Sequence, residues 1–418
     1  MTRAASALAL AVCFLLVFWS LTHHTTPKRS LIVDTPVYEL YGDAVADGAV
    51  PYRDFRLEYP PAALPVFILP SLGRERDLAA YGRWFDREMA LCACLAVVGV
   101  VLALRALGAT AAHELVALGV VTGAPLLLGP VVLSRFDYWP AALAVLALAA
   151  LLHERVAAAA VLAGVAIGAK LWPAVLLPFA LVWLWRRRGT RSAVAFGGVA
   201  VAVVAAIFIP FIALSPAGVW HSVRVQFVRP LQLESLGSAV LITAHHLFGG
   251  GLGVGNAYGS QNALSAASGP AAAVTTVLLV LALVAVFVGF VRGEPTGARL
   301  VAACAAATAA LLAFGKVFSP QFLIWLVPLV PLVPSLVADA LLAAALLLTQ
   351  TWFPRNYWDF ANGLYVRESL EVLARDIVVV ALFAVLATRV LRRARAARPA
   401  SAGAAARARP AGAAPRDL

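Results

Sequence analysis

The stretch VAAAAVLAGVAIGAKLWPAVLLPFALVWLW (156–185) decides how the chain crosses a membrane. It is thirty residues long and almost wholly apolar, with Lys170, Pro173 and Pro178 in its middle. One continuous helix would be about 45 Å long, against a bilayer core of about 30 Å, and would carry a charge near its centre. Two short helices place Lys170 at one membrane face and Arg186–Arg188 at the other. The two interpretations differ by one membrane crossing, so they place every later loop and the C-terminus on opposite sides of the membrane.

The distribution of arginines favours two helices. That choice puts Arg186–Arg188, Arg292 and the C-terminal tail on the same side as Arg3 and Arg105, as the positive-inside rule requires. The whole net charge of +12 then falls on the inside, and the outer face is neutral. We therefore predict that both termini are cytoplasmic. The excess charge indicates topology and attraction to anionic lipids, and we expect no nucleic-acid partner.

The composition indicates a polytopic all-α membrane protein. The chain has 62% hydrophobic and only 13% charged residues, whereas soluble domains have about 45–50% and about 25%. Soluble enzyme folds are therefore excluded. All four cysteines lie in apolar runs, with neither zinc spacing nor a disulfide framework. Because no Asp-x-Asp pair and no glycine-rich phosphate loop after a strand is present, we expect no metal and no cofactor.

About twelve spans can be assigned within a membrane domain over residues 1–388. They are 4–21, 89–107, 114–133, 139–152, 156–169, 171–185, 192–213, 271–291, 299–314, 321–335, 337–353 and 370–388. The first is predicted to be uncleaved, since no small-x-small site follows it. Large outer loops cover 22–88 and 214–270. The Ala/Arg/Pro-rich tail, 389–418, is predicted to be disordered.

The two outer loops contain candidate interfacial helices. Residues 62–72 are apolar but too short to cross, so we expect this segment at the interface or re-entrant. In 216–228, Trp220, Val223 and Phe227 share one helical face, which is typical of a helix lying in the membrane surface.

Charged residues at the outer ends of the predicted spans are the candidates for catalysis and for phosphate binding. Arg135 and Asp137 lie between the third and fourth spans, Lys170 between the fifth and sixth, and Lys316 between the ninth and tenth. If the bundle is compact, these turns and the first loop enclose one polar cavity facing outward. Asp34, just after the first span, together with surrounding cations suits an acid–base step beside a phosphate.

Each of these residues also has a structural interpretation. Asp34 suits the N-cap of a helix beginning at Thr35-Pro36. Glu58 suits a loop ion pair with Arg53 or Arg56.

The remaining candidates are equally open. Arg135 and Asp137 suit an ion pair with each other across their turn. Lys316 stands in what reads as an ordinary turn. Tyr38 and Tyr59 are able to stack on sugars but also suit an interfacial aromatic belt.

Six short motifs carry a resemblance to a known family. They are DTPVY (34–38), PYRDF (51–55), EYPP (58–61), RFD (135–137), GAKLWP (168–173) and KVFSPQ (316–321). Together they resemble the family 87 glycosyltransferases, polytopic membrane enzymes of the GT-C type, over most of residues 1–335. The resemblance is thinnest in 214–270 and 354–369, where acceptor choice would be determined.

The resemblance implies an inverting glycosyltransferase of the plasma membrane with an outward-facing active site. The donor would be a polyprenyl-phosphate sugar carrying mannose, another hexose or arabinofuranose. The acceptor would be an envelope glycolipid or glycan. Asp34 matches the first-loop acidic residue of GT-C enzymes and would act as general base.

The remaining residues divide between donor phosphate and substrate. The candidates for binding the donor phosphate are Lys170, Arg135, Lys316 and Arg229. The candidates for other substrate contacts are Tyr38, Glu58, Tyr59, Asp137 and Gln321. Two alternatives stay open. A transporter or flippase would use Lys170 and Lys316 as anion ligands but predicts two related halves, and a GT-C-like scaffold would have no activity.

Overall fold

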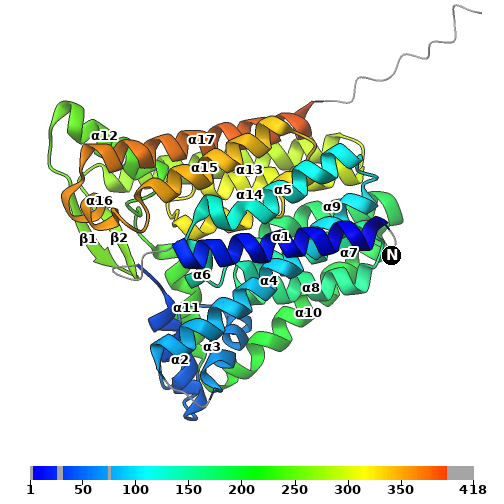
Figure 1. Cartoon of the computed structure of the whole chain (residues 1–418), viewed down its shortest axis with the longest axis horizontal. Coiled ribbons are helices and arrows are strands. Elements are labelled where there is room, and N and C mark those ends of the chain that lie inside the picture. Colours follow the sequence, from blue (N-terminus) through cyan, green and yellow to red (C-terminus); the bar gives the residue numbers. More distant parts are fainter. Residues whose placement is uncertain (1–2, 26–31, 74–76, 393–418) are drawn as a thin grey trace, which may run out of the picture.

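The computed structural model describes residues 3–25, 32–73 and 77–392 and is a helical bundle with a small β-hairpin at one end (Figure 1). The α-helices are α1 (Arg3–Thr25), α2 (Thr35–Ala46), α3 (Leu64–Ser71), α4 (Leu78–Ala106), α5 (Ala111–Leu128), α6 (Val131–Ser134), α7 (Tyr138–Leu152), α8 (Val156–Ala169), α9 (Leu177–Arg188), α10 (Thr190–Leu214), α11 (Pro216–Val228), α12 (Leu236–Phe248), α13 (Ser268–Arg292), α14 (Gly297–Phe314), α15 (Leu336–Trp352), α16 (Tyr357–Gly363) and α17 (Val366–Leu391). The short 3-10 helices are η1 (Pro61–Ala63), η2 (Trp172–Leu176), η3 (Pro320–Trp325) and η4 (Val330–Leu332), and the strands are β1 (Gly253–Ala257) and β2 (Ser260–Leu264).

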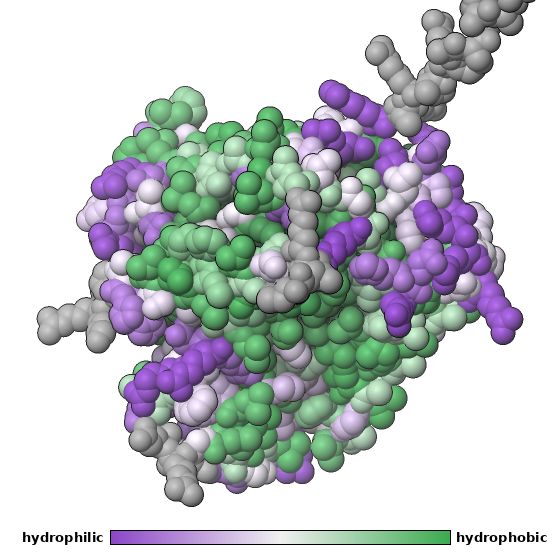
Figure 2. Space-filling model, turned by 45° about the vertical axis from the view of Figure 1, so that its right-hand side comes forward, coloured by the Kyte–Doolittle hydropathy of each residue, from purple (hydrophilic) through white to green (hydrophobic). Residues whose placement is uncertain are grey.

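Six of the described helices are long and apolar enough to cross a bilayer, namely α1 from Ser6, α4, α5, α10, α13 and α14. The pair α15 and α16, bent by 74°, adds a seventh if it is one broken span. In Figure 2, apolar residues cover the middle of the visible face and hydrophilic residues gather towards its two sides. These features confirm an all-α polytopic membrane protein. The count of twelve spans stays a prediction.

The deciding stretch is broken where the sequence predicts. Helix α8 ends at Ala169, Lys170 is extended, and η2 and α9 follow. Pro173 explains the break, because proline lacks a backbone N–H and disfavours helical conformation in the residue before it. The N-terminal end of α1 and the C-terminal end of α17 lie at the same end of the bundle (Figure 1). That arrangement agrees with the two-helix topology, and which end is cytoplasmic stays a prediction.

The span predicted at 321–335 is not a continuous α-helix. This stretch forms the 3-10 helices η3 and η4 joined by turns, and contains no α-helix. Prolines at 328, 331 and 334 remove the backbone donors that a continuous α-helix needs. Its apolar side chains are buried all the same, Leu323 and Val330 completely. The segment therefore belongs to the core of the bundle.

The two long loops that the sequence predicts to be on the outer side are more structured than the sequence indicates. Helix α3 lies within the predicted segment 62–72 and packs against α2 and α4. Helix α11 covers 216–228 and leaves Trp220 and Phe227 two-thirds exposed, 66% and 68%. Helix α12 and the antiparallel hairpin β1–β2 were not predicted. The hairpin matters because its second strand also pairs with residues 231–233. Gln232, in the middle of that segment, lines the cavity described below.

The close approach of α2 to α3 gives a stability prediction. A Cβ atom at Gly42 would overlap the carbonyl oxygen of Phe67 and the hydroxyl of Ser71. Gly42→Ala is therefore expected to destabilise the fold by about 1–3 kcal/mol, seen as a lower midpoint of thermal unfolding in detergent. Gly82→Ala in α4 is the control, because nothing lies within 4 Å of its added Cβ. Equal midpoints for the two variants would contradict the packing.

Candidate active site

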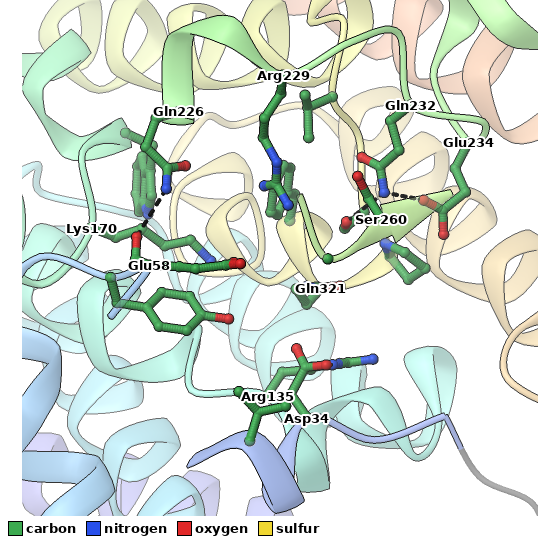
Figure 3. Close-up of a pocket in the computed structure, with 18 of the residues that line it drawn as sticks. Asp34, Glu58, Arg135, Lys170, Gln226, Arg229, Gln232, Glu234, Ser260 and Gln321 are labelled. Carbon is green, nitrogen blue, oxygen red and sulfur yellow. Dashed lines mark hydrogen bonds and ion pairs between the residues drawn. The ribbon is translucent and has the colours of Figure 1, made fainter. Parts of the chain in front are cut away.

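A polar cavity of about 390 Å³ opens at the end of the bundle where the loops gather. Figure 3 shows Arg229 on the side opposite Asp34 and Arg135, with Glu58 and Glu234 on the two flanks. The predicted site residues that line this cavity are Asp34, Glu58, Tyr59, Arg135, Lys170, Arg229 and Gln321. Three predicted residues do not line it, namely Tyr38, Asp137 and Lys316.

Asp34 is held by an ion pair rather than by capping. It precedes α2, but its side chain makes no capping hydrogen bond. Its Oδ1 atom pairs with Arg135, and its Oδ2 atom accepts from the Tyr38 hydroxyl at 3.3 Å. Arg135 also donates to the carbonyl of Ile32 at 3.2 Å, so one guanidinium fixes both the carboxylate and the chain before it. The Asp34 side chain is 28% exposed and accessible from the cavity.

Asp137 pairs with Lys170, so the predicted alternative of an Arg135–Asp137 pair is wrong. Lys170 Nζ lies 2.6 Å from Asp137 Oδ1, and Trp325 Nε1 donates to the same oxygen at 2.6 Å. Asp137 is completely buried, while the Lys170 side chain keeps 16% exposure at the cavity. The ammonium group also sits over the rings of Phe136 and Phe322, at 4.7 and 5.1 Å. Asp137 thus neutralises Lys170 from beneath the cavity floor.

Arg229 is the cavity cation with no carboxylate within 4 Å among the described residues. It follows α11 and donates through Nη2 to the carbonyl of Tyr258 at 2.5 Å. Tyr258 and Gly259 form the hairpin turn, with φ of 56° and 65°. Burial raises the pKa of Glu58, and the nearby positive charge of Arg229 offsets only part of that rise. Arg229 is therefore the cation most available to an anionic ligand.

Lys316 and Tyr38 support the cavity from outside it. Lys316 Nζ donates to the carbonyl of Phe227 at 2.7 Å, and its own carbonyl accepts from Gln232 N at 2.9 Å. Tyr38 is buried and stacks on Phe67 with centroids 4.5 Å apart. Lys316 thus holds the segment after α11, and Tyr38 holds Asp34.

Sequence reasoning missed Gln232 and Glu234, which form one flank of the cavity. Glu234 is 3% exposed, and burial raises its pKa to about 8. A signal was present, because Glu234 is the single acidic residue in the predicted outer loop 214–270. Among the described residues, no group of three or more His, Cys, Asp or Glu side chains is placed to hold a metal ion. The metal-free expectation stays a prediction.

The chain matches the model of a known protein family. Residues 57–320 match the model of glycosyltransferase family 87, which is more than half of the chain. Arg135, Lys170, Arg229 and Glu234 lie inside the matched segment. Asp34 lies outside it. No curated protein matches the chain.

Proposed function

Because the chain belongs to glycosyltransferase family 87, we propose that it moves a sugar from a polyprenyl-phosphate donor to an envelope glycolipid or glycan. The sugar would be mannose, another hexose or arabinofuranose, and transfer would take place on the outer side of the plasma membrane. One observation carries the proposal: a single cavity joins Asp34 to Lys170 and Arg229 beside helices apolar enough to cross a bilayer. Membership of a glycosyltransferase family favours transfer over the transporter alternative.

The proposed reaction is one displacement at the anomeric carbon. Asp34 takes the proton of an acceptor hydroxyl while that oxygen forms a bond to the anomeric carbon. The bond from that carbon to the phosphate oxygen breaks on the opposite face, so the configuration inverts. Polyprenyl phosphate leaves as an anion and needs neutralising charge rather than a proton. Arg135 keeps the Asp34 carboxylate oriented for the attack.

The cavity cations differ in their availability to the departing phosphate. Arg135 is paired with Asp34, and Lys170 is paired with Asp137. Among the described residues, the hydrogen-bond partner of the Arg229 guanidinium is the backbone carbonyl of Tyr258, and no carboxylate lies within ion-pair distance of it. We therefore assign Arg229 as the main phosphate ligand, with Lys170 beside it. Lys316 is no longer proposed as a ligand, because its ammonium group is used outside the cavity.

Arg229→Ala is expected to lower transfer by about 10²-fold, as loss of one charged transition-state donor does. The measurement is the initial rate with a labelled polyprenyl-phosphate sugar. Arg224→Ala is the matched control, since Arg224 is exposed on α11 and does not line the cavity. A loss of equal size in both variants would contradict the assignment.

The function itself is tested with purified protein in detergent or vesicles. The donors are polyprenyl phosphates carrying mannose, glucose or arabinofuranose, and envelope lipid extract supplies acceptors. Mass spectrometry of the products should show one added sugar from one of these lipids. GDP-mannose, UDP-glucose and UDP-galactose serve as soluble comparison donors. Transfer from a nucleotide sugar alone would refute the lipid-phosphate donor.

A further inference from the structure

Gln232 and Glu234 are joined in one hydrogen-bonded group on the flank of the cavity (Figure 3). The Gln232 side-chain nitrogen donates to Glu234 Oε2 and also to the Ser319 hydroxyl at 2.9 Å. The backbone on both sides is tied down, because Leu233 N donates to Gln261 O at 2.9 Å. Arg375 donates to the carbonyl of Glu234 at 2.5 Å. The group is therefore rigid before any ligand arrives.

The orientation of Gln232 leaves an acceptor without a donor. Both N–H groups of its amide are used, while its Oε1 atom is buried and has no hydrogen-bond partner in the part of the chain that the structure describes. The residue is only 3% exposed and lines the cavity. An unpaired buried carbonyl oxygen costs free energy that a ligand hydroxyl would recover. Glu234 Oε1 likewise receives no hydrogen bond from the described residues.

On the proposed function we infer that Gln232 and Glu234 bind the hydroxyl groups of the donor sugar. A carboxyl and an amide side by side offer both donors and acceptors to vicinal hydroxyls. Gln232 and Glu234 would therefore determine which sugar is accepted, whereas Arg229 and Lys170 would bind the phosphate of the donor.

The position of Glu234 supports the donor sugar over the phosphate. Glu234 interacts electrostatically most strongly with Arg375, and also with Arg135 on the side of the base and with Arg229 on the side of the phosphate. The transferred sugar must lie between those two sides, because the acceptor attacks it opposite the leaving phosphate. Burial raises the pKa of Glu234 to about 8, so at neutral pH the group is mostly a neutral acid that is able to donate a hydrogen bond.

The test compares binding of two lipids that differ only by the sugar. Trp172 and Trp325 line the cavity, so their fluorescence reports binding of polyprenyl phosphate and of polyprenyl-phosphate-mannose, -glucose or -arabinofuranose. Wild type should bind one glycosylated lipid about tenfold more tightly than the bare phosphate. Glu234→Ala and Gln232→Ala should abolish that advantage and leave binding of the bare lipid unchanged. Arg229→Ala should weaken both lipids alike.

Gln261→Ala is the matched control, because Gln261 is an amide on the neighbouring strand that does not line the cavity. Gln232→Met keeps the length of the side chain without its amide and replaces the alanine variant if that one does not fold. A preserved sugar advantage in the folded variants, an equal loss for both lipids, or no advantage in wild type would overturn the sugar site alone. Failure of wild type to bind any polyprenyl phosphate would overturn the proposed function and the sugar site together.

Discussion

Asp34→Asn is expected to lower the turnover number by about 10²–10⁴-fold while leaving donor binding within a few-fold of wild type. The amide keeps the volume and hydrogen-bonding shape of the carboxyl but cannot take the acceptor proton at neutral pH. Asp34 faces the cavity and lies next to Arg135, so the loss falls on the chemical step rather than on the lipid. Single-turnover transfer from a labelled donor, together with donor binding, separates the two effects.

The control for this variant is Asp43→Asn on α2, the helix that Asp34 precedes, since Asp43 does not line the cavity. It should keep transfer within about twofold, because surface substitutions away from a site change little. Asp34→Asn also leaves Arg135 without its counter-charge, so the thermal midpoint must be measured in parallel. A folded Asp34→Asn protein with unchanged turnover would remove Asp34 as the base.

The fold was predictable where the pattern of apolar runs and charges was simple. The break at Lys170 followed from one charge and two prolines within thirty residues, and from the arginine cluster that comes directly after them. The stretch 321–335 was not predictable in the same way, because hydropathy records burial but not helix type. The sequence of this stretch contains several prolines, but its length and hydropathy are those of a membrane-crossing helix, and these two properties led to the prediction. The hairpin was missed because the glycines of 249–259 are typical of a flexible loop, and Leu252 and Val254 alternate over too few residues to indicate a strand.

The site was predictable in part, because charged residues next to the ends of different helices come together in one cavity. Asp34, Arg135, Lys170 and Arg229 are far apart in sequence but meet in one cavity, and each stands directly before or after a helix. The position of a residue at the end of a predicted span does not determine the direction of its side chain. For this reason the sequence predicts Lys316 as a phosphate ligand, whereas in the structure its ammonium group donates to the carbonyl of Phe227. The partners of the buried ion pairs could not be predicted from the sequence either. Asp137 is two residues from Arg135, but its partner Lys170 comes from the end of the next helix.

The pair Asp137–Lys170 gives the second large expected effect. Asp137→Asn keeps an acceptor for Trp325 but leaves the Lys170 ammonium without its counter-charge beneath the cavity. Removing one partner of a buried ion pair costs about 3–5 kcal/mol, so the free energy of unfolding should fall by about that much. Unfolding in detergent, followed by circular dichroism against temperature or denaturant, measures the change. A fall below about 1 kcal/mol would contradict the buried pair.

The double variant Asp137→Asn/Lys170→Met separates the structural role of Lys170 from its proposed contact with phosphate. Replacing both charges leaves no uncompensated ion, so most of the lost stability should return. Transfer should nevertheless stay about 10²-fold below wild type, because the phosphate has lost a charged donor. Recovery of transfer together with stability would show that Lys170 acts only through the fold. Low stability in the double variant would instead show that the aromatic rings around Lys170 require its charge, since the ammonium lies over Phe136, Phe322 and Trp325.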